Sequence, residues 1–222
     1  MRKCAMPLMM LLVVAIAETA FGHGVPVDVF ADQNGKLFSG EPAYESEFNL
    51  VAGVLLTTDL PGIGVSTPGN GLQAGDQIGI DVVDKLLYFD GTNVVPTAAS
   101  VVIENPGATT SFTVTNTSGE QTGMFWSTYN GSPGWDAHGQ FTLDPLSAPT
   151  GVYGLVVRLT SPSYDSSDPV VIAFSNGVDD AVREAGIDAF QEALVPEPST
   201  LTLLGIGLLG LTLLGRGFRR QA

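Results

Sequence analysis

The sequence predicts an all-β fold, a β-sandwich of jelly-roll or immunoglobulin-like form, followed by a short C-terminal helix. Two observations predict it. Short apolar or alternating runs broken by Gly, Pro, Asn and Asp fill the middle of the chain, which is typical of strands joined by turns. Asp179 to Leu194 instead holds helix-forming residues with apolar side chains three or four apart. Roughly nine strands at this spacing favour two packed sheets.

The runs that alternate or are rich in β-forming residues are the candidate strands. Asn34-Gly35 predicts a tight hairpin after the first of them, because both residues tolerate positive φ. Asp90 to Asn93 predicts a second hairpin, with Val94-Val95 returning, and Leu60 to Gly71, with two Pro-Gly pairs, predicts a long loop. The candidate strands are Val25 to Phe30, Lys36 to Ser39, Glu45 to Leu50, Gln77 to Val83, Leu86 to Phe89, Ser100 to Glu104, Thr110 to Thr115, Gly139 to Leu143, Gly151 to Thr160 and Val170 to Phe174.

The helix expected over Asp179 to Leu194 has candidate caps and one weak position. Asp179 or Asp180 would cap its first turn. Gly186 is expected to weaken it by about 1 kcal/mol relative to alanine. The apolar face is predicted to consist of Val182, Ala185, Ala189, Phe190 and Ala193.

The N-terminal residues 1–22 are predicted to be a signal peptide. Arg2 and Lys3 precede an apolar run, Leu8 to Ala17, that is too short to span a membrane. Ala15-Ile16-Ala17 and Ala20-Phe21-Gly22 both have the small-x-small form of a cleavage site, and the second leaves a polar region after the apolar run. Cleavage after Gly22 would therefore remove the single cysteine and make His23 the new N-terminus. Residues 23–194 then form one extracytoplasmic domain without disulfides.

The C-terminal residues 195–222 have three parts. Val195, Pro196, Glu197, Pro198 and Ser199 form a rigid joint. Residues 200–218 are apolar and would span roughly 24–28 Å as a helix, enough for a bilayer core. The basic end starts at 216, and its arginines would stay cytoplasmic; they are Arg216, Arg219 and Arg220.

This Pro-Glu-Pro joint, Leu/Gly-rich helix and terminal arginines together resemble the PEP-CTERM sorting signal of bacterial envelope proteins. The resemblance covers about Val195 to Arg220. It implies export, retention in the inner membrane with the domain outside, and processing near the motif by an exosortase. It also implies a final location at the cell surface or in the extracellular matrix, where polysaccharide is a candidate partner.

The exported part is strongly acidic. From His23 to Ser199 there are four basic residues against 22 acidic ones, so its net charge is −18. Such a domain repels phosphate backbones, which excludes nucleic acid as a partner, and suits cations or solubility outside the cell.

A metal site is one candidate function. A processed N-terminal His23 offers its α-amine and imidazole to one ion, and His138 would add a third nitrogen. Such a set favours Cu(II), or another divalent metal, and resembles the histidine brace of lytic polysaccharide monooxygenases. Asp28, Asp136 and Glu47 are candidate carboxylate neighbours. The alternative is that the two histidines lie in unrelated places.

A carbohydrate-binding surface is the other candidate. Met124 to Phe141 contains Trp126, Tyr129 and Trp135, whose rings could stack on sugars if they are exposed, or fill the core if they are not. No nucleophile elbow, catalytic cysteine or phosphate loop is present. The sequence therefore predicts a non-enzymatic surface protein first, with metal binding and carbohydrate binding as alternatives.

Overall fold

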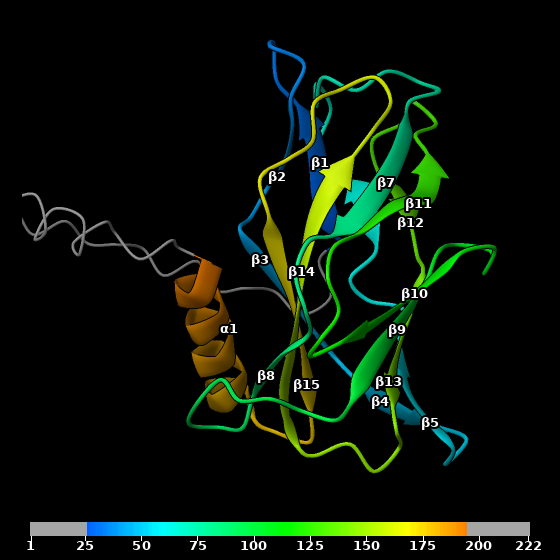
Figure 1. Ribbon diagram of the computed structural model, residues 1–222. Helices are drawn as coiled ribbons and strands as arrows, with labels where there is room; N and C mark the ends of the chain where they lie inside the picture. Colours follow the sequence, from blue (N-terminus) through cyan, green and yellow to red (C-terminus); the bar gives the residue numbers. More distant parts are fainter. Residues whose placement is uncertain (1–25, 195–222) are drawn as a thin grey trace, which may run out of the picture.

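The computed structural model describes residues 26–194, which form three β-sheets and one helix (Figure 1). The six-stranded sheet contains β3 (Ala43–Glu47), β7 (Gln77–Val82), β8 (Leu87–Phe89), β11 (Gln121–Thr128), β14 (Gly151–Thr160) and β15 (Val170–Asn176). The five-stranded sheet contains β4 (Asn49–Val51), β5 (Leu55–Thr58), β9 (Ser100–Glu104), β10 (Ser111–Thr115) and β13 (Gln140–Asp144). The four-stranded sheet contains β1 (Val27–Ala31), β2 (Leu37–Ser39), β6 (Ile63–Val65) and β12 (Trp135–Ala137).

The sheets pack as a sandwich, as the sequence predicts. One face of the six-stranded sheet and the inner faces of both smaller sheets share a single hydrophobic core. Alternation along the strands builds it: Tyr153, Leu155 and Val157 of β14 point inward, and so do Val101 and Ile103 of β9. Most pairings are antiparallel, but β1 pairs with β6 and β15 pairs with β3 in parallel.

The helix α1 (Asp180–Leu194) covers part of the outer face of the six-stranded sheet (Figure 1). It contacts β8, β14 and β15 and closes a second, smaller core. Asp179 caps it, because its Oδ1 accepts a hydrogen bond from the Val182 amide at 3.0 Å. The predicted helix and its cap are therefore confirmed.

The buried face of α1 differs from the predicted one. Ala185 and Ala193 are exposed, whereas Gly186, Ile187, Phe190 and the charged Arg183 are buried. A Cβ added at Gly186 would lie 2.9 Å from Cβ of Val152, so this glycine allows close packing of the helix on the sheet. Phe190 likewise packs over Gly154 of β14.

A buried ion pair links α1 to the sheet edge. Arg183 Nε donates to Glu45 Oε2 of β3 at 2.6 Å, and both side chains are about 5% exposed. The alternation of β3 turns Glu45 toward the helix while Tyr44 enters the main core. Burial of both charges is tolerated because they neutralise each other.

Several strands differ from the prediction. The Asn34-Gly35 hairpin is confirmed, with β1 and β2 antiparallel and Gly35 at φ 82°. The second predicted hairpin is reduced to a single bridge between Phe89 and Val94, because β8 pairs with β14. The predicted loop from Leu60 to Gly71 contains β6, and the strands β5, β11 and β12 were not predicted.

The ends of the chain lie outside the described residues. The predicted signal peptide 1–22, His23, the sorting residues 195–199, the spanning segment 200–218 and the basic end from 216 are among them. Within residues 26–194, no helix is both long and apolar enough to cross a membrane.

Replacing Gly186 tests the close packing of α1. Gly186→Ala is expected to lower the free energy of unfolding by about 1–3 kcal/mol through overpacking against Val152, although alanine favours the helix by about 1 kcal/mol. Urea unfolding of the purified protein measures it. Ala185→Gly, at the exposed neighbour, should cost only the helix propensity, about 1 kcal/mol. A more stable Gly186→Ala protein would contradict the packing.

Candidate functional site

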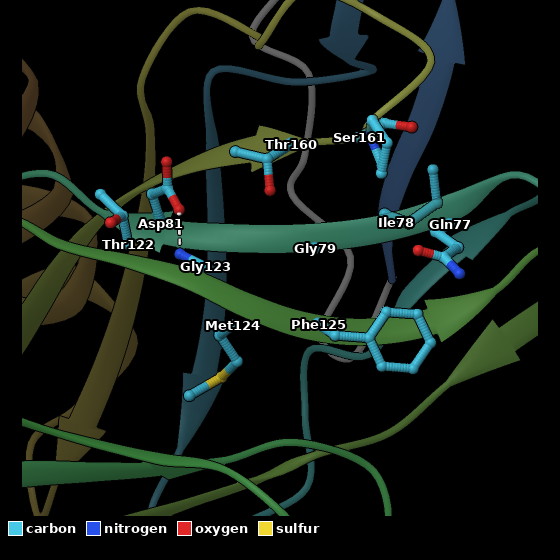
Figure 2. Close-up of a pocket in the computed structure, with 11 residues that line it drawn as sticks. Gln77, Ile78, Gly79, Asp81, Thr122, Gly123, Met124, Phe125, Thr160 and Ser161 are labelled. Atoms are coloured by element: carbon cyan, nitrogen blue, oxygen red, sulfur yellow. Dashed lines mark hydrogen bonds between the residues drawn. The ribbon is translucent and has the colours of Figure 1, made fainter.

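A hollow lies on the part of the six-stranded sheet's outer face that α1 leaves uncovered (Figure 2). Its volume is about 400 Å³. Strands β7 and β11 and the last residues of β14 form its floor and walls. The lining residues are Gln77, Ile78, Gly79, Asp81, Thr122, Gly123, Met124, Phe125, Thr160, Ser161 and Pro162.

The middle of the hollow is one row of three residues across three strands. Thr160 of β14 and Phe125 of β11 are both register partners of Gly79 on β7. Thr160, Gly79 and Phe125 are labelled in Figure 2. A Cβ added at Gly79 would lie 2.8 Å from Oγ1 of Thr160 and 2.7 Å from the Met124 carbonyl oxygen. The Thr160 hydroxyl therefore lies close over Gly79, and this packing depends on glycine.

Irregularities in β11 set which side chains face the hollow. Its register against β7 shifts between Gln121 and Met124 and again between Phe125 and Ser127. Bulges of this kind re-aim side chains locally. Met124 and Trp126 point into the core, while Phe125 between them is 45% exposed.

The carboxylate at one end of the hollow is hydrogen-bonded and ion-paired. Asp81 Oδ1 accepts the Gly123 amide at 2.8 Å, drawn as a dashed line in Figure 2, and Oδ2 accepts from Arg158 at 3.3 Å. Arg158 also donates to Glu120 at 2.6 Å. These contacts hold the carboxylate in place and leave no unpaired cation there among the described residues.

The polar side chains around the rest of the hollow have free hydrogen-bonding capacity. Within the described part of the chain, Gln77, Thr122 and Thr160 make no side-chain hydrogen bonds, and the Ser161 hydroxyl only accepts, from the Ser163 amide at 3.2 Å. An amide and three hydroxyls can both donate and accept. The site thus combines one exposed aromatic ring with four groups suited to binding hydroxyls.

The candidate metal ligands lie elsewhere, on the four-stranded sheet. His138 follows β12; its Nδ1 lies 2.9 Å from the Asp59 carbonyl oxygen and its Nε2 lies 2.8 Å from Asp136 Oδ2. Both neighbours are acceptors, so the protonated ring can donate to both. Burial lowers the pKa of His138, but the hydrogen bond to Asp59 and the charge of Asp136 outweigh it, and the net result is a raised pKa.

Asp28 and Asp136 share one face of that sheet. Both are register partners of Gly64 on β6, one on each side. Asp28 accepts hydrogen bonds from the amide and hydroxyl of Ser66 at 2.8 and 2.6 Å, and Glu47 belongs to the six-stranded sheet. Within residues 26–194, no group of three or more His, Cys, Asp or Glu residues is arranged to hold a metal ion. His23 lies outside this range.

The aromatic residues expected on a sugar-binding loop are buried. Trp126 is 1% exposed, and its indole donates to the Ala137 carbonyl at 2.9 Å. Trp135 is 8% exposed and packs edge-on against Tyr129 at 5.6 Å between ring centroids. These three rings fill the core, so the prediction of a stacking surface made of them is wrong. The exposed ring is the neighbouring Phe125, which strand alternation beside the Trp126 position could have indicated.

Comparison with known proteins identifies the end of the chain. Residues 194–221 match the family model of the PEP-CTERM protein-sorting motif. The chain carries a PEP-CTERM sorting signal. This implies an exported protein with a membrane-anchored signal that an exosortase processes. No curated protein matches the chain.

The contact between His138 and Asp136 can be tested by titration. Because the pKa of His138 is raised above 6.5, its two hydrogen bonds stabilise the fold below about pH 6.5, and this stabilisation is lost as the pH rises through the raised pKa. NMR of the imidazole Cε1 proton should show a midpoint above 6.5 that falls in Asp136→Asn. His138→Gln assigns the resonance. An unchanged midpoint in Asp136→Asn would contradict the ion pair.

Proposed function

We propose that the protein is a non-enzymatic surface or extracellular-matrix protein whose acidic β-sandwich is the part delivered by the PEP-CTERM signal. The observation that carries the proposal is the motif match at residues 194–221. Signal peptidase removes residues 1–22. The segment 200–218 then holds the domain outside the inner membrane until an exosortase acts near Val195 to Pro198.

The docking of α1 on the sheet supports this division of the chain. The motif match begins at Leu194, the last residue of a helix that Gly186, Phe190 and Arg183 dock on the sheet. Cleavage anywhere after Leu194 therefore leaves the docked helix with the sandwich. The acidic surface, with a net charge of −18 between His23 and Ser199, favours solubility outside the cell and disfavours nucleic acid.

Changing the motif tests sorting. In cells that express an exosortase, replacing Pro196, Glu197 and Pro198 with alanine should leave most of the protein unprocessed in the membrane fraction. Mass spectrometry of the fractions gives both termini. Glu192→Ala, an exposed acidic residue of α1, is the matched control and should be processed normally. Normal processing of the triple variant would refute the sorting role.

Copper binding is a second candidate, favoured by the position of Pro26 on the four-stranded sheet. The Val27 amide donates to the Gly62 carbonyl at 2.8 Å. A Cβ added at Gly64 would lie 3.3 Å from both Pro26 Cβ and Asp136 Oδ1, so both side chains flank Gly64. Three residues of chain can span about 10 Å, which is enough for His23 to reach Asp136 and His138.

Calorimetry with Cu(II) tests this candidate. Protein that begins at His23 is expected to bind one Cu(II) ion. Adding one alanine before His23 removes the α-amine chelate and should weaken binding at least tenfold, as should His138→Ala. Equal affinity for all three proteins would exclude a site made by the two histidines.

A further inference from the structure

We propose that the hollow over β7, β11 and β14 binds a neutral saccharide, one or two sugar rings of an extracellular polysaccharide. This deepens the binding role of the surface protein proposed above and names its ligand class. The volume of about 400 Å³ is within the usual range for ligand sites and fits a ligand of this size.

The aromatic side of the hollow matches the apolar face of a sugar ring. Phe125 is 45% exposed although it lies in the middle of a strand whose neighbours Met124 and Trp126 are fully buried. A pyranose presents C–H groups on its faces and hydroxyls around its edge, so it can cover a flat aromatic ring with little desolvation of polar groups. Ring burial of this kind supplies apolar contact area with few rotamers to fix.

The opposite side of the hollow matches the hydroxyls at the edge of the sugar. Thr160 lies across Gly79 from Phe125, and Ser161, Gln77 and Thr122 complete the rim. Among the described residues, no protein group hydrogen-bonds to the side chains of Thr160, Gln77 or Thr122. A sugar hydroxyl both donates and accepts, as these side chains do, so it can satisfy them without a charge on either partner.

The charges in and around the hollow favour a neutral ligand. The only carboxylate in the lining, Asp81, already accepts from Gly123 and Arg158, and Arg158 is paired in turn with Glu120. An anionic polysaccharide would approach a domain of net charge −18 and find no free cation in the hollow.

A peptide strand is a poorer occupant than a sugar. Strand β7 pairs with β11 on one side and β14 on the other, so its peptide groups are already used in the sheet. Strand addition is therefore excluded at β7, and it would require the edge of the sheet at β11, outside the hollow.

Affinity electrophoresis of the full-length chain, in a zwitterionic detergent without a sugar headgroup, tests the proposal. The gels contain neutral polysaccharides (dextran, laminarin, xyloglucan) or the acidic polysaccharide alginate. At least one neutral polymer is expected to retard the protein, and alginate is not. Phe125→Ala should raise the dissociation constant tenfold or more, and Thr160→Val should raise it severalfold.

Phe38→Ala is the matched control, because Phe38 is 42% exposed but lies on β2 of another sheet. It should bind as the unmodified protein does, and thermal unfolding should show that each variant remains folded. The proposal is overturned if no neutral polymer retards the protein, if only alginate does, or if Phe125→Ala binds like Phe38→Ala. It is also overturned if Phe125→Ala changes only self-association in sedimentation, because the face would then be a protein interface. Each binding test uses purified protein. Its result therefore does not depend on whether the proposed sorting occurs, and the two proposals can fail separately.

Discussion

The six-stranded sheet has two faces to cover, and residues 26–194 supply one helix for the second. The inner face is covered along its length by the two smaller sheets. A helix is about 10–12 Å wide and strands are about 4.8 Å apart, so one helix covers roughly two strands. Helix α1 lies along β14 and β15 with β8 beside them (Figure 1). The rest of the outer face, over β7 and β11, has no cover among the described elements.

The sequence of β14 is adapted to this partial cover. Its outward residues are Val152, Gly154 and Val156 under the helix, then Arg158 and Thr160 beyond it. The strand changes from apolar to polar on one face within ten residues. On β7 the outward residues are Gln77, Gly79 and Asp81, which are polar or lack a side chain. The hollow is therefore where the sheet changes from a packing surface to a solvated one.

The Arg183–Glu45 pair fixes how the helix sits on this sheet. Two buried charges gain little net stability over an apolar pair, and Arg183 here also pairs with Asp180 at 2.9 Å. A helix placed with Arg183 over the β3 edge brings its guanidinium to Glu45. The ion pair therefore specifies where the helix lies on the sheet more than it adds to stability. Gly186 and Gly154 determine how closely the helix approaches the sheet.

The sequence pattern predicts the elements that have clear local signals. It fails for elements whose formation depends on long-range contacts. Ser100–Glu104 and Gly151–Thr160 match their predicted bounds because alternating or apolar runs end at turn residues. Strand β6 was missed because it forms by pairing with β1 and β12, although it lies among Pro-Gly pairs. The predicted buried face of α1 differs from the observed one because Gly186 is buried through its contact with Val152 on β14. A glycine gives no apolar signal in the sequence that would indicate this contact. The sequence predicts the candidate sugar site on Trp126 and Trp135, but composition shows aromatic residues without their direction; Trp126 and Trp135 face the core, and Phe125 is the exposed neighbour.

The helix that precedes the sorting signal and the hollow lie on different parts of the same sheet. The signal follows α1, which is docked over β8, β14 and β15, whereas the hollow lies over β7, β11 and the far end of β14. Processing after Leu194 leaves every residue of the hollow and its supporting ladder unchanged. A ligand bound at Phe125 and Thr160 makes no contact that the helix needs. The proposed binding and the proposed processing therefore use separate residues, so the geometry does not require one event to precede the other.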